Sequence, residues 1–162
     1  MIDYQKYNLD SFKLFVENIL SKKFKGKFNY SDIKGRVETI LLGETSRLTA
    51  KSFRNVISTL DEDFDKFCKL FFKNHPASKL KSLENNTNKL EILFNPLLNS
   101  KAQLSKASCI KETRLGELFK NRFNELYAYE AYGLAIAVGL KPSQLFNYFY
   151  GDGERPLVGI EV

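Results

Sequence analysis

Apolar residues recur at intervals of three and four through most of the 162-residue chain. This spacing places them along one side of an α-helix. In the first half the pattern predicts helices over 8–24, 32–42, 49–60 and 61–71. Polar stretches separate these segments, as expected for short helices that pack their apolar sides together.

Residues suited to helix ends stand close to these boundaries. Asp10 or Ser11 is expected to cap the first helix and Thr49 the third, because a side-chain oxygen can accept from an unpaired amide of the first turn. The carboxylates of 61–65 oppose the positive end of the fourth helix dipole. Gly43 is expected to end the second helix in the left-handed conformation.

The second half shows the same periodicity between residues 100 and 150. The pattern predicts a short helix over 102–108, a tight turn, and another short helix over 111–120. A polar loop (121–125) and an apolar helix (126–138) follow. Pro142 then opens a last short helix, in the position where proline is favoured.

The turn between the two short helices of the second half carries a distinctive pattern. Leu104 is followed by a small residue, Ser105, and the turn itself holds Cys109 and the aliphatic Ile110. This pattern resembles the DNA-binding helix-turn-helix of the phage-repressor family (Cro-like, Xre-like, lambda-repressor-like). Cys109 stands where that family usually has glycine, and Ser105 where it has alanine. The resemblance implies a unit with a five-helix core.

A shift of 78 residues superimposes apolar positions of the first half on those of the second without a gap. It pairs Val37 with Leu115 and Leu48 with Leu126, and the match runs through loops as well as helices. We therefore expect an all-α fold of two tandem helix-turn-helix units of five helices each, the second better preserved. Gly26 interrupts the place of the second helix in the first unit, so that unit is expected to be degenerate.

The expected organisation is a degenerate N-terminal unit (1–76), a C-terminal helix-turn-helix unit (77–150) and a short extended tail (151–162). Pro76 supports the first boundary, because the residue before a proline disfavours the helical conformation. Pro96 conflicts with the repeat, since it falls in the last turn of the first helix of the second unit. The tail is expected to pack on its own unit; the alternative is an arm that clasps a second subunit.

The chain is cationic, with a net charge of +6 and a pI near 9.2, and residues 1–80 carry +5 of that charge. Such a balance favours polyanionic partners. Fifteen residues of the first half hold six basic side chains opposed only by Asp32: Lys22, Lys23, Lys25, Lys27, Lys34 and Arg36. This patch favours contact with phosphates, and the alternative is an ordinary solvated surface.

The composition is typical of a folded cytoplasmic protein. Hydrophobic residues make up 43% of the chain, which is enough for a packed core. No apolar run approaches the roughly 20 residues that span a bilayer, and the N-terminus lacks the apolar segment of a signal peptide. Cys68 and Cys109 show no metal-ligand spacing and are expected to be buried free thiols, with a disulfide between them as the alternative.

The sequence offers little to catalysis, so neither an enzyme, a cofactor nor a metal is expected. His75 is the single histidine, and no nucleophile or acid lies near it at motif spacing. The isolated glycines form no phosphate-binding loop. The acidic residues of 61–65 could suggest a metal, but their place at a helix start favours capping. The aromatic residues of 119–150 lie at helical spacing and are expected in the core rather than stacked on bases.

The resemblance places the DNA contacts on the second short helix, whose first turns enter the major groove in that family. Arg114 is expected to pair with guanine, Thr113 to contact a phosphate or a thymine methyl, and Glu112 to accept from cytosine. Lysines nearby would bind phosphates. The expected DNA-binding residues are Lys111, Glu112, Thr113, Arg114, Glu117, Lys101, Lys106, Lys120 and Arg122 in the second unit, and Lys34 and Arg36 in the first.

The sequence thus predicts sequence-specific binding of double-stranded DNA by a transcriptional regulator of bacterial or phage type. One chain could cover adjacent half-sites as an intrachain pseudo-dimer, or two chains could form a homodimer. The alternative is a helical protein-interaction module, an antitoxin or adaptor, whose helix-turn-helix no longer binds DNA. Glu112 and Glu117 favour the reading that the expected contact residues are ordinary exposed side chains of an amphipathic helix, because carboxylates that face DNA weaken binding. A small enzyme with an unrecognised site is a third and weaker hypothesis.

Overall fold

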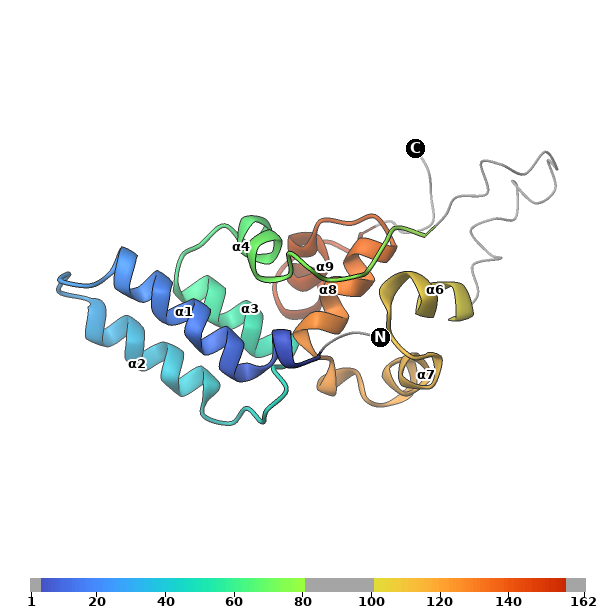
Figure 1. Cartoon of the computed structure of the whole chain (residues 1–162), viewed down its shortest axis with the longest axis horizontal. Helices are drawn as coiled ribbons and strands as arrows, with labels where there is room; N and C mark the ends of the chain where they lie inside the picture. Colours follow the sequence, from blue (N-terminus) through green and yellow to red (C-terminus); the bar gives the residue numbers. More distant parts are fainter. Residues whose placement is uncertain (1–3, 81–100, 157–162) are drawn as a thin grey trace.

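The computed structural model describes residues 4–80 and 101–156, and within these ranges the regular structure is helical (Figure 1). This confirms the all-α prediction. The elements are η1 (Tyr4–Tyr7), α1 (Leu9–Lys23), α2 (Tyr30–Leu41), α3 (Ala50–Thr59), α4 (Phe64–Phe71), α6 (Lys101–Ser108), α7 (Glu112–Lys120), η3 (Phe123–Glu125), α8 (Ala128–Ala137) and α9 (Pro142–Tyr150). In Figure 1, α1 and α2 lie at one end of the long axis and α6 and α7 at the other.

The helix starts follow local side-chain chemistry. Thr49 caps α3 by accepting from the Ser52 amide, as predicted, and Asp63 caps α4 in the same way. The prediction for α1 was wrong, because Asn8, in an extended conformation, accepts from the Ser11 amide at 2.9 Å.

The end of α2 also differs from expectation. Gly43 does not have a positive φ, and the helix stops at Leu41. The chain is instead held by Glu44, whose carboxylate accepts from the amide and the hydroxyl of Thr49 at 2.9 and 2.7 Å. A carboxylate just beyond the glycine therefore fixes the loop between α2 and α3.

One hydrophobic core contains residues from both halves of the chain. Phe53 of α3 is fully buried, and its ring lies 5.7 Å from that of Phe146 of α9. Phe72, just after α4, stacks on Tyr132 of α8 at 4.5 Å. The boundary predicted at residue 76 stays a prediction, but apolar packing runs across it.

Two helices of the second half, α8 and α9, follow two of the first, α3 and α4, at an offset of 78 residues, whereas α2 and α7 begin 82 residues apart. Helices α3 and α8 each have 10 residues and begin 78 residues apart, and α4 and α9 begin at the same offset. An isolated antiparallel bridge joins Thr49 to Tyr127, again 78 residues apart. Around it the Ala50 amide donates to Leu126 and the Ala128 amide to Leu48, at 2.8 and 2.9 Å. Such reciprocal pairing is the geometry of a two-fold contact.

The two halves differ ahead of α2 and α7. In the second half α6 precedes α7, whereas the matching residues 24–29 form a turn with Gly26 at φ 82°. The structure therefore has no helix at 24–29 to match α6, and the tandem pair of helix-turn-helix units stays a prediction.

Segment 77–80 joins the second half. Its Ser78 amide donates to Ala107 of α6, and its Leu80 amide donates to Ala137 of α8. The helix position of Pro96 and the tail residues 157–162 lie outside the described residues. Among the helices of 4–80 and 101–156, none has both the length and the apolar character that a bilayer span requires.

Candidate nucleic-acid interface

Helices α6 and α7 are joined by a tight turn, as the sequence predicted. Helix α6 ends at Ser108, Cys109 has φ 63°, and α7 begins two residues after the buried Ile110. A positive φ of this size is left-handed, a conformation that glycine adopts most easily. The turn position that the family gives to glycine is thus left-handed here too, although a cysteine occupies it.

Serine hydroxyls hold this turn together. Ser105 donates to the Ile110 carbonyl, so the small residue of the pattern also binds the far side of the turn. Ser108, fully buried, donates back to the Leu104 carbonyl at 2.6 Å. Both hydroxyls are satisfied locally, and these bonds fix the direction of α7 relative to α6.

Gly133 of α8 lets α6 approach closely. A Cβ at this glycine would lie 2.5 Å from the Ser108 carbonyl oxygen and 3.1 Å from the His75 ring. The sequence reasoning missed Gly133, because nothing local distinguishes it from other small residues of the apolar helix.

Helix α7 buries one side and exposes the other. Leu115 and Leu118 are 0% and 6% exposed, as their spacing predicted. On the other side, the expected contact residues Lys111, Glu112 and Thr113 are exposed, and the described part of the chain does not cover them.

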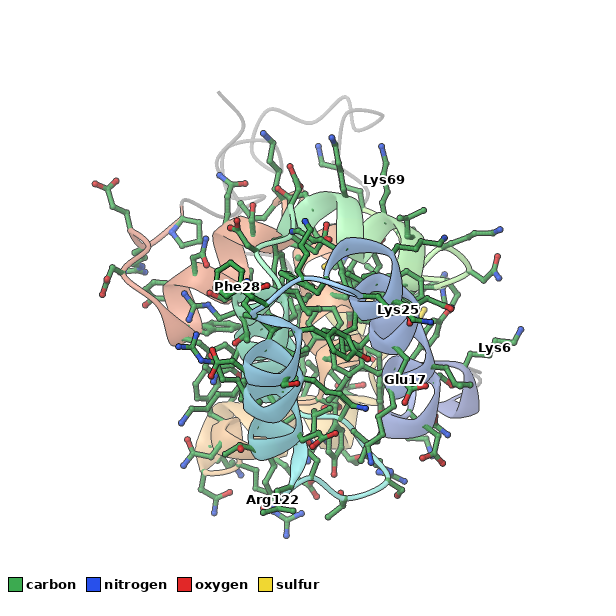
Figure 2. The ribbon with its side chains drawn as sticks, turned by 90° about the vertical axis from the view of Figure 1, so that its left-hand side faces the viewer. Lys6, Glu17, Lys25, Phe28, Lys69 and Arg122 are labelled. Atoms are coloured by element: carbon green, nitrogen blue, oxygen red, sulfur yellow. The ribbon has the colours of Figure 1, made fainter. Side chains whose placement is uncertain are left out.

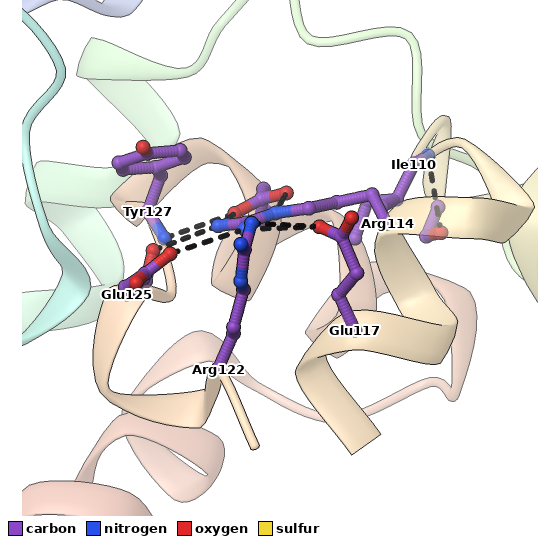
Figure 3. Close-up of polar contacts among 8 residues, drawn as sticks. Ile110, Arg114, Glu117, Arg122, Glu125 and Tyr127 are labelled. Atoms are coloured by element: carbon purple, nitrogen blue, oxygen red, sulfur yellow. Dashed lines mark hydrogen bonds and ion pairs between the residues drawn. The ribbon is translucent and has the colours of Figure 1, made fainter. Parts of the chain in front are cut away.

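Arg114, the expected guanine contact, is instead engaged within the protein (Figure 3). Its side chain is 18% exposed and donates to both carboxylate oxygens of Glu130 at 3.0 and 3.1 Å. It also donates to the Glu125 carbonyl at 2.8 Å, and the guanidinium lies 4.9 Å from the centre of the Tyr127 ring. The bidentate pair raises the pKa of Arg114 above its usual value. The geometry corrects the assignment: Arg114 positions α7 rather than facing outward.

Glu130, which the sequence reasoning did not single out, connects α7 to the start of α8. It is 3% exposed, and its carboxylate accepts from the Tyr127 amide at 3.1 Å as well as from Arg114. The same carboxylate thus accepts from the N-cap amide of α8 and binds the neighbouring helix. A glutamate three residues after an N-cap position was a usable signal, although Tyr127 cannot supply the serine or threonine half of the capping box.

The remaining charges near α7 fall into paired and unpaired groups. Glu117 lies 3.8 Å from Arg114 and 3.5 Å from Arg122, so its charge is largely balanced. Glu125 lies 3.7 Å from Arg114. Exposed lysines without an ion pair in the described part of the chain surround these residues: Lys101, Lys106, Lys111 and Lys120. Among the described residues near α7, the exposed charges outside these ion pairs are therefore the four lysines and the carboxylate of Glu112.

The expected contacts of the first unit lie on α2, away from α7 (Figure 1). Lys34 and Arg36 are both exposed. The Arg36 guanidinium pairs with Asp32 one turn earlier at 3.4 Å. The structure therefore does not bring these two residues together with those of α7.

His75 serves the fold. Its Nδ1 accepts from the Ala77 amide at 3.1 Å, so Nε2 carries the proton that is donated to the Tyr129 carbonyl at 2.9 Å. Burial lowers the pKa of this histidine to about 4. Cys68 and Cys109 are free, but only Cys68 is fully buried. The described residues include no group of three potential metal ligands.

The chain matches no protein-family model, no curated protein and no solved structure.

Proposed function

We propose that this protein binds double-stranded DNA sequence-specifically through α7, as a transcriptional regulator of bacterial or phage type. The observation that carries the proposal is the α6–turn–α7 arrangement with a left-handed Cys109. It holds the N-terminal turn of α7 outward, which is the presentation that a helix needs to enter a major groove.

The exposed residues at the start of α7 have the chemistry of base contacts. Lys111 can donate to guanine, Glu112 can accept from cytosine N4, and Thr113 can contact a thymine methyl or a phosphate. Arg114, held by Glu130, keeps these residues in place. A base contact requires a fixed helix, so the positioning of α7 by Arg114 supports base contact by the residues before it. The outer contacts, which would bind phosphates and set the register, are Lys101, Lys106 and Lys120. Arg122, which is paired with Glu117, would lie at their edge.

The arrangement supports one groove-binding helix per chain. The first half has a turn where α6 would lie, and α2 therefore lacks the supporting helix of α7. The reciprocal contact at Thr49 and Tyr127 supports a pseudo-symmetric chain, but the intrachain pseudo-dimer that covers two half-sites would need a second groove-binding helix. A palindromic site would then require a homodimer, and one chain would occupy a single half-site.

Selection of bound sequences from a random duplex pool tests the proposal. We expect one enriched site, and we expect Thr113→Ala to lower the preference for that site by about 1–3 kcal/mol at one base pair. Thr45→Ala provides the matched control, since Thr45 is also exposed but lies in the α2–α3 loop. No enrichment, or equal site preference in the Thr113 and Thr45 variants, would contradict the proposal.

The alternative is a protein-interaction module, an antitoxin or adaptor. The observation that favours it is the apolar surface beside the same helix, where Phe119 and Phe123 are 61% and 40% exposed. The salt dependence of binding to random duplex separates the two. Groove binding across several phosphates weakens steeply as salt rises, whereas an interaction module would not bind duplex even at low salt.

A further inference from the structure

The turn between α1 and α2 projects a second cationic surface far from α7. Four exposed lysines surround it, and we call them the basic tip: Lys22, Lys25, Lys27 and Lys34. None of the four forms an ion pair or a side-chain hydrogen bond within the described part of the chain. Their charges are therefore available to a partner.

Lys23, the neighbouring lysine that does have partners in the protein, helps to hold the tip in place. Lys23 donates to the carbonyls of Leu60 and Asp61, both at 2.8 Å, and lies 3.5 Å from Glu62. This binds the end of α1 to the loop between α3 and α4. The base of the tip is therefore held against the rest of the protein.

An aromatic ring points outward at the same place. Phe28 is 102% exposed, whereas Phe24 on the other side of the turn is 8% exposed and belongs to the core. Figure 2 shows Phe28 and Lys25 together on the end of the molecule that faces the viewer. Gly26, at φ 82°, makes the turn that separates the inward from the outward phenylalanine.

The tip and α7 are separated along the long axis of the molecule. In Figure 1 the turn that carries the tip lies at the left end, and α2 runs from it down to the lower edge, on whose right-hand part α7 lies. A duplex that extends from α7 toward the left end would bring its phosphates to the tip. Contacts to phosphates add affinity without adding sequence preference.

We propose that the basic tip makes a second, sequence-independent contact with the phosphate backbone of the duplex whose groove α7 enters, and that Phe28 packs against that duplex. This inference rests on the proposed function. A lipid surface fits less well, because one exposed ring offers less apolar area than a myristoyl chain, which alone gives only marginal membrane binding.

The test compares two triple variants of equal charge change. Lys22→Ala/Lys25→Ala/Lys27→Ala removes three of the four lysines of the tip, and Lys66→Ala/Lys69→Ala/Lys73→Ala removes three exposed lysines on and just after α4, on another side of the molecule (Figure 2). Affinity is measured over a range of salt for duplexes that carry the selected site and a flank lengthened on one side or the other. Thermal unfolding confirms that each variant is folded.

For the tip variant we expect at least ten-fold weaker binding at low salt and a salt slope reduced by about 2 to 3, because each lost phosphate contact removes roughly 0.9. The loss of affinity should occur only on duplexes whose flank, on one side of the selected site, is long enough to reach the tip. The preference for the selected site should stay unchanged. Phe28→Ala should weaken binding several-fold with the slope unaltered, because the ring carries no charge.

Equal affinities of the two triple variants on every duplex would overturn the second contact. The proposed function would still be supported in that case if the Thr113→Ala variant lost its site preference. A loss independent of flank length would also overturn it, because the tip would not share the duplex with α7. Tip-dependent binding to anionic phosphatidylserine vesicles without tip-dependent binding to DNA would overturn it in favour of a membrane.

Discussion

Arg114 illustrates how one residue can change role between sequence and structure. Its position matches the groove-facing turn of the resembling family, yet a carboxylate sixteen residues later binds it on both oxygens. A guanidinium prefers such a fixed, two-bond partner, especially one that is removed from water. The sequence could not show this, because the partner is brought near only when α8 packs beside α7.

Arg114→Ala should therefore destabilise the protein by about 3 kcal/mol, because it leaves the buried Glu130 carboxylate without its partner. Urea unfolding measures the change. The double variant Arg114→Met/Glu130→Gln should recover part of the loss, since no buried charge remains. A single variant as stable as the parent, with site preference lost, would restore Arg114 to the DNA contact.

The lowered pKa of His75 predicts that the stability of the protein depends on pH. Its pKa is lowered to about 4 in the folded protein from 6.5, so the unfolded chain binds the proton first as the pH falls. Stability is fully present above pH 6.5 and is lost as the pH falls toward 4, by about 1–2 kcal/mol between pH 7 and 5.

Chemical unfolding at both pH values measures this difference. The chain has a single histidine, so His75→Gln should abolish most of the dependence in that range. A His75→Gln protein that keeps the full dependence would show that other groups cause it.

At the scale of elements, the contact between α6 and α8 determines where α7 can lie. Because a Cβ at Gly133 would meet backbone at 2.5 Å, Gly133→Ala should force the helices apart and cost about 1–3 kcal/mol. It should also weaken DNA binding, since α7 follows α6. Thermal unfolding and duplex binding are the two measurements.

Gly116 of α7 provides the matched control. Its Cβ would meet only the end of the flexible Lys101 side chain at 3.4 Å. Gly116→Ala should therefore stabilise the protein by up to about 1 kcal/mol, because alanine is the better helix former. Equal changes in stability and DNA binding in the two glycine variants would show that the close approach of α6 at Gly133 does not determine the position of α7.

Features that depend on neighbours in sequence were predictable, and those that depend on distant neighbours were not. The Thr49 cap and the inward faces of α3 and α7 follow from spacing alone. Asn8 was missed because Asp10 and Ser11, close by, are equally suited to capping. Gly133 and the Arg114–Glu130 pair were missed because packing between helices creates them. The backbone of α6, the turn and α7 was therefore predicted correctly, and the contacts of their side chains less well.

For the molecule as a whole, the predicted offset of 78 residues appears in part of the structure, at α3 with α8 and at α4 with α9. It places α3 opposite α8 and α4 opposite α9, and Asp65 accepts from the amide and hydroxyl of Ser143, its own counterpart, at 2.9 and 2.6 Å. The two halves of the described chain thus contact each other through residues at matching positions.

This shared core predicts a single cooperative unfolding transition. Phe146 of α9 lies against Phe53 and Phe64 of the first half at 5.7 and 4.8 Å. Phe146→Ala should cost about 3–5 kcal/mol, because it removes a fully buried ring and leaves a cavity between the halves. Amide exchange should then accelerate in α3 and α4 as much as in α8 and α9. Faster exchange confined to the second half, or two separate melting steps, would mean that the halves fold independently and that α7 can be moved without disturbing the basic tip.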